Sequence, residues 1–372
     1  MADKTATAPL TGLRMVEFTE NMVGPYIGLL MASLGAEVIK VERPGGESMR
    51  NRNKGLFSAV NRGKKSVVLD LKDPEAQKAA QALIRSADIV AESYRPGVAD
   101  KIGIGYKKTA EINPRAIYLS ISAYGQTGPR RNQPAYDPII AGYAGIPYQM
   151  GVPGGPPDYS ASLALADDAP VFVAVISIMG AVMQRQMTGK GQYLDLSMLD
   201  SALLLMMTRF GGYGVDPKAE GRRARPGSGA FGARDGKYFC IHTAETHFWN
   251  LMLDVLQVPA LERFRDTTPN QRQAEPELIN DALKKRFNER DRDDWVKDLV
   301  EKGVPCGPIL DVGEVLKDEQ LKARGAFEVT GGISFPRFPV RLEGLDAIKL
   351  PAVAALGSDT ETVLASLPKA TA

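Results

Sequence analysis

Short apolar runs alternate with amphipathic segments along the first third of the chain. The amphipathic segments at residues 24–34 and 73–86 have the length and capping residues of helices, Gly24-Pro25 opening the first and Asp73-Pro74 the second. The apolar runs that predict strands are residues 13–18, 36–42, 66–71, 88–93 and 116–123. Strands that alternate with helices favour right-handed crossovers, so we expect an α/β fold with a largely parallel sheet.

Ligands of such folds bind where the carboxyl ends of the strands meet. The segments expected there are residues 19–25, 43–47, Lys72, 93–97 and 123–137. None of them holds a GxGxxG dinucleotide loop or a GxxxxGK[ST] phosphate loop. Hydride transfer and nucleotide hydrolysis therefore lose their usual sequence support.

Two adjacent carboxylates precede the longest apolar segment, residues 170–183. Pro170 fits the first turn of a helix, and an Asp just before it fits the N-cap. A carboxylate at the positive end of the helix dipole is expected to stay ionised near neutral pH, which is the state a nucleophile needs. The pattern by itself leaves a capping role and a catalytic role open. The apolar segment is too short to span a bilayer and predicts a buried helix.

Residues 210–232 break the alternation. They contain many glycines, Pro217, Pro226 and the basic run at residues 222–225. This composition predicts a linker followed by a loop whose backbone closely approaches another group. The basic run suits either an anion site or a solvated charge cluster. A strand at 236–243 and helices near 247–256, 275–287 and 292–301 then predict a smaller α+β domain.

Composition narrows the class of protein. With 372 residues, 44% of them hydrophobic and 24% charged, the chain is expected to form two globular domains. A net charge of +2 gives no reason to expect nucleic acid or a membrane surface as partner. Cys240 and Cys306 suit a reducing compartment, and the N-terminus lacks the apolar core of a signal peptide, so we expect a cytoplasmic protein.

Seven motifs, in order, resemble those of the family III CoA-transferases, which also include the α-methylacyl-CoA racemases. The motifs are LGAEVIKVERPGG at 34–46, NRGKKS at 61–66, VLDLK at 68–72, YRPG at 94–97, YGQTGP at 124–129, TGKGQ at 188–192 and GVPCGP at 303–308. Each motif alone is weak, but seven in order are specific. The resemblance extends from about residue 10 to about residue 364.

The resemblance implies a particular architecture and chemistry. It implies a Rossmann-like large domain from residues 1–210 and 326–372, a linker with a Gly-rich loop at 211–232, and a small α+β domain at 233–325. Two subunits are expected to form an interlocked-ring homodimer. The implied substrates are an acyl-CoA and a carboxylic acid, with no tightly bound cofactor and no metal.

The family's covalent nucleophile is an Asp at a fixed distance before the Thr-Gly-Lys-Gly turn. Counting back from Thr188 gives Asp167, which leaves Asp168 as the expected N-cap; a shift of one residue would exchange the two roles. Each tetrahedral step needs backbone N–H donors. The stretch with Gly227 and Gly229 lies where relatives have a shielding glycine loop, although four successive glycines are absent here. A shielding loop and a plain turn both remain open.

Several positions match family contacts to CoA. The matching residues are Arg43, Leu69, Lys72, Ser93, Tyr94, Arg95 and Lys101. Scattered cations suit a phosphate-bearing ligand when no phosphate loop exists, but each cation taken singly is also an ordinary surface charge. Met22 occupies the position of the catalytic Gln of the formyl-transferring branch, which argues against oxalate or formate as substrate.

Racemase and transferase branches differ at one pair. Racemases have His-Asp after the Gly-Pro turn, whereas this chain has Tyr136-Asp137, and its two histidines, His242 and His247, lie in the expected small domain. Racemisation needs a base on each face of the α-carbon. We therefore favour acyl-CoA:carboxylate transfer, with Tyr136 and Asp137 in supporting roles; core packing of Tyr136 is the alternative. A racemase or epimerase and an inert CoA-binding protein stay open.

Overall fold

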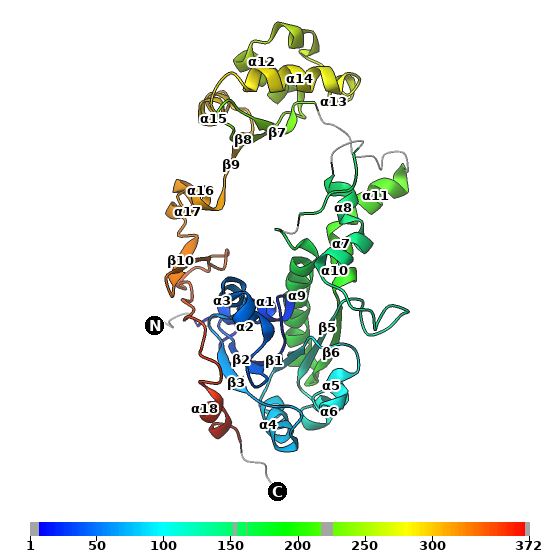
Figure 1. Ribbon diagram of the computed structural model, residues 1–372, viewed down its shortest axis with the longest axis vertical. Coiled ribbons are helices and arrows are strands. Elements are labelled where there is room, and N and C mark those ends of the chain that lie inside the picture. The colour runs from blue at the N-terminus through cyan, green and yellow to red at the C-terminus, as the bar shows by residue number, and fades with distance from the viewer. Residues whose placement is uncertain (1–6, 152–154, 161, 217–225, 369–372) are drawn as a thin grey trace. The chain divides into compact units, whose positions relative to one another are not determined.

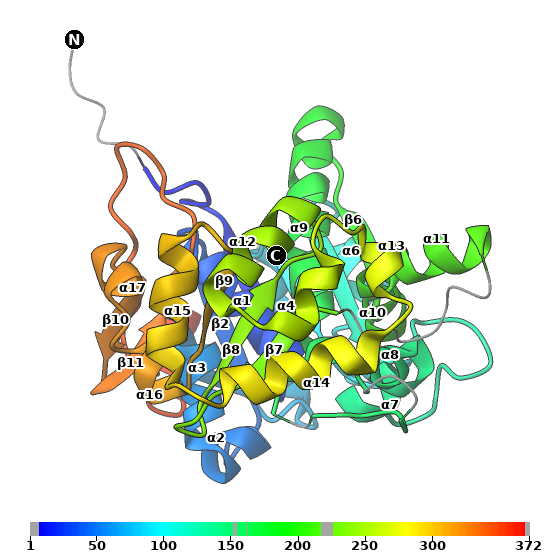
Figure 2. The same ribbon diagram turned by 90° about the horizontal axis from the view of Figure 1, so that it is seen from above.

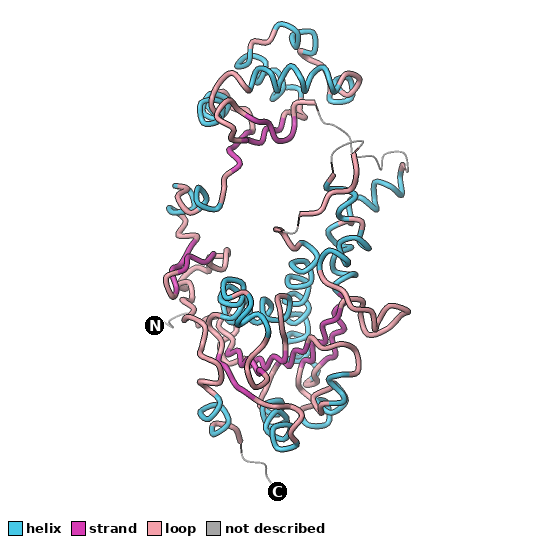
Figure 3. Tube along the Cα trace, in the orientation of Figure 1, coloured by secondary structure: helices cyan, strands magenta, loops and turns pink. Residues whose placement is uncertain are grey.

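The chain forms two compact units. The computed structural model describes residues 7–151, 155–160, 162–216 and 226–368. Unit 1 comprises Met1–Met150, Pro157–Glu220 and Ala326–Ala372, and unit 2 comprises Gly151–Pro156 and Gly221–Gly325. Figure 1 labels the elements of each unit, and Figure 3 distinguishes helices, strands and loops by colour.

A six-stranded parallel sheet organises unit 1. Its strands are β1 (Arg14–Phe18), β2 (Glu37–Glu42), β3 (Lys65–Val68), β4 (Ile89–Glu92), β5 (Ile117–Ser122) and β6 (Gln192–Ser197). They lie in the order β3-β2-β1-β4-β5-β6, and every neighbouring pair is parallel. The predicted α/β class with a parallel sheet is confirmed. The order reverses between β1 and β4, which is where ligands bind in doubly wound folds.

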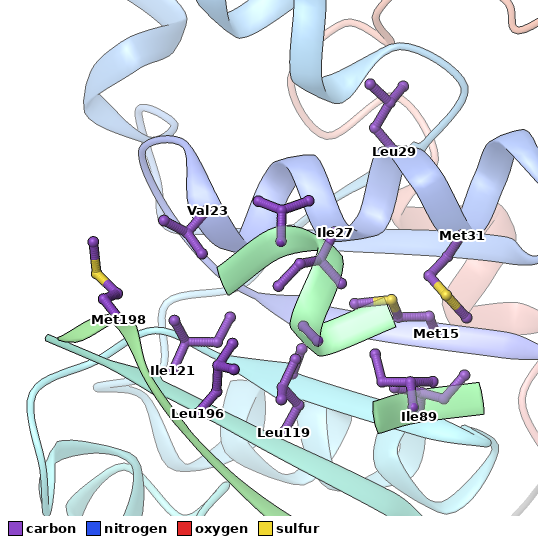
Figure 4. Packing of buried hydrophobic residues seen from close by; sticks show 14 of the residues in the cluster. Met15, Val23, Ile27, Leu29, Met31, Ile89, Leu119, Ile121, Leu196 and Met198 are labelled. Atoms are coloured by element: carbon purple, nitrogen blue, oxygen red, sulfur yellow. The ribbon is translucent and has the colours of Figure 1, made fainter. Parts of the chain in front are cut away.

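Side chains of successive strand residues enter two different cores. Met15 and Ile89 belong to one buried cluster, whereas Val16 and Val90 belong to the cluster on the opposite face. This follows from the period of two along a strand, with both faces of the sheet covered by helices. Figure 4 shows the first cluster, in which Ile27 of α1 (Val23–Ser33) packs near Met15.

The remaining elements of unit 1 cover the sheet and its ends. The helices are α2 (Ser48–Arg52), α3 (Lys54–Asn61), α4 (Pro74–Arg85), α5 (Val98–Lys101), α6 (Tyr106–Ile112), α7 (Asp137–Ala144), α8 (Ile146–Met150), α9 (Leu165–Thr188), α10 (Met198–Leu205), α11 (Met207–Val215) and α18 (Thr360–Ala365), and a separate antiparallel pair is β10 (Phe327–Thr330) with β11 (Ile333–Pro336). The expected strand at 66–71 ends earlier, at Val68, because the chain turns from Asp70 into the Asp73 cap of α4.

Helix α9 begins five residues before the predicted start. Its first residue is Leu165, its N-cap position is Ala164, and Pro170 lies inside the helix. The prediction of a helix opened by Pro170 with Asp168 as its N-cap is therefore wrong. The helix is 24 residues long and, by length and composition alone, is long and apolar enough to cross a membrane, so the prediction that this segment is too short is also wrong. Its inner face, including Val171 and Ile178, is buried in the core of unit 1.

The C-terminal segment completes the edge of the sheet. Asp359 accepts a hydrogen bond from the Ser66 N–H at 2.9 Å, and the Thr360 hydroxyl accepts one from the Val68 N–H at 3.0 Å. Edge strand β3 thus has its outer N–H groups satisfied by α18 and the residues before it.

Unit 2 is a small three-stranded antiparallel sheet packed with helices. Its strands, in the order β7-β8-β9, are β7 (Ser228–Gly232), β8 (Tyr238–His242) and β9 (Cys306–Ile309). Its helices are α12 (Thr246–Leu256), the 3₁₀ helix Pro259–Phe264, α13 (Pro269–Arg272), α14 (Pro276–Phe287), α15 (Arg292–Glu301), α16 (Val312–Val315) and α17 (Glu319–Ala323). Figure 2 shows α14, whose Phe287 packs edge-to-face on Phe239 of β8.

The predicted linker at 211–232 is wrong at both ends. Helix α11 occupies its first residues, and strand β7 occupies its last five. Pro217 and the basic run at 222–225 lie outside the described residues. Glycine-rich composition misled the prediction, because β7 gains its stability from pairing with β8, a partner that local composition does not reveal.

Candidate active site

A cavity of about 250 Å³ opens at the carboxyl ends of β1, β4 and β5. Asp167, in the first turn of α9, lines this cavity. Tyr136, Arg95 and the loop from Glu20 to Gly24 form other parts of its wall. The position agrees with the point at which the strand order reverses. We call this space the Asp167 cavity.

A second cavity of about 200 Å³ adjoins the first. Arg43, Leu69 and Lys72, at the ends of β2 and β3, line it. Glu20 and Tyr94 line both cavities, so the two spaces are neighbours. We call the second space the β2–β3 cavity. Both cavities lie at the carboxyl end of the parallel sheet of unit 1.

A carboxylate on another helix caps the turn that carries Asp167. Asp137 Oδ1 accepts hydrogen bonds from the N–H of Ala166 at 2.7 Å and from the N–H of Asp167 at 3.1 Å. Ala164, at the N-cap position, has no side-chain acceptor, so Asp137 supplies the cap from α7. The Tyr159 hydroxyl donates to Asp137 Oδ2 and so orients the capping group.

Burial makes Asp167 harder to ionise. Removal from water raises the pKa of Asp167 to about 7, and the charges of Asp137 and then Asp168 act in the same direction. The expectation of a carboxylate that is fully ionised near neutral pH is therefore wrong. The helix dipole favours the anion, but desolvation and two neighbouring carboxylates outweigh it.

Asp168 occupies a different environment. It does not line the Asp167 cavity, although burial and the Asp137 charge raise its pKa as well. The negative charge of Asp168 contributes to raising the pKa of Tyr26 on α1. Of the two adjacent carboxylates, only Asp167 belongs to the cavity, which agrees with the register counted from Thr188.

Tyr136 is a surface residue of the site and not a core residue. Its side chain is 71% exposed while it lines the Asp167 cavity, so the alternative of core packing is wrong. Asp137, the next residue, is buried. Tyr136 occupies the N-cap position of α7 and Asp137 its first helical position, so the first of these adjacent residues lines the cavity and the second is buried.

The residues predicted to bind CoA separate into two groups. Arg43, Leu69 and Lys72 line the β2–β3 cavity, whereas Ser93 and Arg95 line the Asp167 cavity. Tyr94 lies on both walls, and burial raises its pKa to about 12. Lys101 ends α5 and lines neither cavity.

Gly229 lies in strand β7 of unit 2, and Gly227 lies in the turn just before that strand. Gly229 pairs with Ile241, so residues 228–230 form a strand, which neither the shielding loop nor the plain turn predicted; only Gly227 lies in a turn. Gly227 has φ +73°, and a Cβ there would approach the Trp249 ring to 2.7 Å. Close packing on Trp249 accounts for this glycine, and its part in shielding an intermediate stays a prediction.

Buried charges support the loop that forms one wall of the Asp167 cavity. Lys40 Nζ donates to the Thr19 carbonyl at 2.7 Å, and Lys64 Nζ donates to Glu17 Oε1 at 2.8 Å. Glu47 Oε2 accepts from the N–H of Asn21, a residue held at φ +67°. Such a backbone is uncommon outside glycine, so the surrounding contacts must hold it in place. Sequence analysis missed this network because its members lie in four separate segments.

The glycine on α1 opposite Glu17 makes the network possible. A Cβ on Gly28 would lie 2.1 Å from Glu17 Oε2 and 2.9 Å from Lys64 Nζ. Only a residue without a side chain leaves room for this ion pair between α1 and β1.

Sequence analysis also missed three polar residues, two of them at strand ends and one, Arg131, in the loop that follows β5. Ser122 and Arg131 line the Asp167 cavity. Glu92, the last residue of β4, is buried; it accepts hydrogen bonds from Ser120 and from the Tyr94 N–H, and burial raises its pKa to about 7. Position at the carboxyl end of a strand was the one sequence signal that could have identified Ser122 and Glu92.

Comparison with known proteins identifies the family of this chain. The sequence matches CoA-transferase family III over residues 10–360. The chain belongs to CoA-transferase family III. It is 35% identical to the acetyl-CoA:oxalate CoA-transferase of Acetobacter aceti, over 91% of this chain and 90% of that protein. It is 31% identical to the succinyl-CoA:glutarate CoA-transferase of Mus musculus, over 98% of this chain and 87% of that protein.

A solved structure shows the same fold. The crystal structure of a CAIB/BAIF family protein from Brucella suis superposes with a TM-score of 0.90 at 31% identity, covering 98% of this chain and all of that one. The resemblance inferred from seven motifs is thereby confirmed, and this family III member is a CoA-transferase enzyme.

Proposed function

We propose that this protein transfers CoA between two carboxylic acids through a covalent intermediate on Asp167. The observation that carries the proposal is the position of Asp167: it is the carboxylate of the Asp167–Asp168 pair that lines a cavity next to the cation-bearing β2–β3 cavity. A carboxylate can act as nucleophile in acyl transfer. Family membership supports the same reaction class.

The two cavities suit the two ends of an acyl-CoA. Arg43 and Lys72 supply positive charge for phosphates, and Leu69 supplies an apolar surface for the adenine. The thioester end then extends past Tyr94, which lines both spaces, into the Asp167 cavity. In this arrangement the reactive carbonyl lies on the side of Asp167, as the proposed covalent step requires.

The reaction consists of two matched halves. Asp167 attacks the thioester carbonyl, the C–S bond breaks, and CoA leaves as a thiolate, which gives a mixed anhydride. The thiolate attacks the Asp167 carbonyl carbon and expels the donor acid as a carboxylate, which leaves an aspartyl-CoA thioester. The acceptor carboxylate attacks this thioester, and the released thiolate then attacks the acyl carbonyl, which forms the new acyl-CoA and frees Asp167.

No proton is transferred in this sequence. The reaction therefore needs an ionised Asp167 but no general base, which agrees with a unit 1 that contains neither His242 nor His247. Racemisation would need a base on each face of the α-carbon, and Tyr136 stands where the racemase branch has its histidine. Transfer is thus better supported than racemisation or epimerisation.

The names of relatives guide the choice of acids to test. The Acetobacter aceti protein acts on oxalate and the Mus musculus protein on glutarate. Met22, which lines the Asp167 cavity, argued against oxalate, but a 35% identical oxalate transferase keeps that acid in the panel.

We also propose that the protein is a homodimer in the cytoplasm. The free thiols of Cys240 and Cys306 suit that reducing compartment.

Intact-protein mass spectrometry tests the covalent step. The full chain, mixed with acetyl-CoA or succinyl-CoA and quenched, is expected to gain the mass of CoA less water. Asp167→Asn should gain nothing, and Asp168→Asn, the matched control beside it, should still form the adduct. An adduct that persists in the Asp167→Asn variant, or none in the wild type with any donor, would refute the mechanism. An inert CoA-binding protein would bind the donors without an adduct.

A further inference from the structure

A buried carboxyl group adjoins the tyrosine that lines both cavities. Glu92, the last residue of β4, is 4% exposed, and none of the ion pairs in the described parts of the chain includes it. Removal from water raises its pKa to about 7, although hydrogen bonds from Ser120 and from the Tyr94 N–H act in the opposite direction. A buried carboxyl group without a cation is costly to the fold, which indicates that this position serves more than stability.

The two oxygens of this carboxyl group hold two different loops. Oε2 of Glu92 accepts a hydrogen bond from the N–H of Tyr94, in the loop after β4, at 2.8 Å. Oε1 accepts one from the hydroxyl of Ser120 on β5. The Ser120 oxygen in turn accepts a hydrogen bond from Nε2 of Gln126, in the loop after β5, at 2.8 Å. Glu92 thus connects the loop that contains Tyr94 with the loop that contains Gln126.

The same line of hydrogen bonds extends to the strands on either side. The two carboxylate oxygens of Asp195, on β6, accept from the N–H of Gln126 at 3.1 and 3.0 Å. On the other side, the hydroxyl oxygen of Ser93 accepts from the N–H of Glu20, in the loop after β1, at 3.1 Å. The contacts therefore connect β6, β5, β4 and the loop after β1, in the order in which these strands lie in the sheet.

The residues held in this way form walls of the ligand cavities. Tyr94 and Glu20 line both the Asp167 cavity and the β2–β3 cavity, and Ser93 lines the Asp167 cavity. The backbone contact with Glu92 therefore fixes a residue that stands where the two cavities meet. A shift of Tyr94 would change the passage along which an acyl-CoA is proposed to extend.

We propose that Glu92 is a positioning residue for acyl-CoA, which holds Tyr94 directly and the loop after β5 through Ser120. The inference rests on the proposed function, because it assumes that CoA occupies both cavities. It assigns the effect to hydrogen bonds and not to negative charge. Glutamine can therefore replace Glu92, since the amide oxygen accepts from the Tyr94 N–H while the NH₂ group donates to the Ser120 oxygen.

Calorimetric titration of the full chain with CoA measures this role without any turnover. Glu92→Leu has a side chain of similar size but neither acceptor, so we expect the Kd for CoA to rise about tenfold. Glu92→Gln should keep the Kd within about twofold of the wild-type value. Ser120→Ala removes only the link to Gln126 and should raise the Kd about fourfold, which provides the test if leucine prevents folding.

Asn113 offers a matched control at the opposite, amino end of the sheet. Its Nδ2 donates to the carbonyl groups of Ile84 at 3.1 Å and of Ala87 at 2.8 Å, so it connects the segments that precede β4 and β5. Asn113→Ala should lower the urea midpoint of unfolding and leave the Kd for CoA within about twofold. It thereby separates a loss of stability from a loss of CoA affinity.

A double-mutant cycle shows whether Glu92 acts through Tyr94. Tyr94→Ala removes the ring from both cavity walls and should itself raise the Kd for CoA. Addition of Glu92→Leu to Tyr94→Ala should raise the Kd by less than about threefold further, because the side chain that Glu92 positions is already absent.

Several results would overturn the inference and leave the proposed function intact. They are an unchanged Kd in Glu92→Leu or, if that variant does not fold, in Ser120→Ala, and a loss in Glu92→Gln equal to that in Glu92→Leu. An equal loss in Asn113→Ala, or effects of Glu92→Leu and Tyr94→Ala that multiply in full, would do the same. A wild-type chain that neither binds CoA nor forms an adduct on Asp167 would refute the proposed function and this inference with it.

Discussion

Asp137 Oδ1 accepts a hydrogen bond from the N–H of Asp167 at 3.1 Å. The two side chains come from α7 and α9, thirty residues apart, and the contact gives one carboxylate two effects on the other. As a cap, Asp137 fixes the first turn of α9 and so the position of Asp167. As a charge, it raises the pKa of Asp167, after the larger effect of burial.

Replacement of Asp137 should separate these two effects. Asp137→Asn keeps a neutral acceptor for the N–H groups of Ala166 and Asp167 but removes the charge, so the pKa of Asp167 should fall and the acid limb of activity should move to lower pH. Asp137→Ala removes the cap as well and should lower the free energy of unfolding by about 1 kcal/mol. The pH profile of kcat/KM and urea unfolding measure the two effects; an unchanged acid limb in Asp137→Asn would contradict the charge effect.

The wild-type enzyme should gain activity as the pH rises through about 7. The reason is that the nucleophile must be ionised and burial raises the pKa of Asp167 to about 7. The measurement is kcat/KM from pH 5 to 9 with an acid whose own ionisation is complete in this range. A rate already constant at pH 5 would show that substrate or partner contacts restore an ordinary pKa.

Asp167→Asn should stabilise the fold at alkaline pH. The pKa of Asp167 is about 7 in the folded protein against an ordinary value of 3.8, so the wild type loses stability as the pH rises from about 4 to about 7. The amide has no charge to desolvate. One pKa unit corresponds to about 1.4 kcal/mol, and partial exposure reduces the total, so we expect a gain of roughly 1–3 kcal/mol above pH 7 and a much smaller one near pH 4. Urea unfolding at equal protomer concentration measures it; a gain independent of pH would contradict the argument.

Lys64→Met should destabilise unit 1 strongly. Lys64 Nζ bonds Glu17 Oε1 at 2.8 Å and the Pro25 carbonyl at 2.7 Å, and its removal leaves Glu17 buried without its closest cation. Loss of one partner of a buried pair costs about 3–5 kcal/mol. Lys78→Met, on the exposed face of α4, is the control and should change unfolding by less than about 0.5 kcal/mol. Chemical denaturation distinguishes the two, and similar losses in both would contradict a structural role for the network.

The outer face of α9 should form part of a homodimer interface. Phe172, Ile176, Met183 and Met187 recur at helical spacing, and all four are exposed in the single chain. A contiguous apolar face of this kind is typical of subunit interfaces. Light scattering of the wild type should give twice the mass of one chain, and Ile176→Asp should weaken association, whereas Thr362→Asp on α18 should not. A stable folded monomer at dilute concentration would contradict the prediction.

Much of the fold was predictable because its signals are local. Short apolar runs identified β1 to β5, and Asp73-Pro74 marked the start of α4. The predicted start of α9 was wrong because the local signal, Pro170 after an Asp, was not the one that decided where the helix begins. The N-terminal N–H groups of the helix are capped by Asp137, which lies 30 residues before Asp167 in the chain. The strand β7 was missed for the same reason, since its partner β8 stabilises it.

The amino-acid sequence by itself determined the family and the parallel sheet, and its spacing from Thr188 singled out Asp167 as the candidate nucleophile. These depend on periodicity and motif order, which are properties of neighbours in the chain. Only the tertiary structure decided that burial raises the pKa of Asp167 to about 7, that six of the seven residues predicted to bind CoA line two neighbouring cavities, and that Ser122 and Arg131 line the same cavity as Asp167. Burial, charge proximity and cavity walls arise from segments that meet only after folding, and no local pattern encodes them.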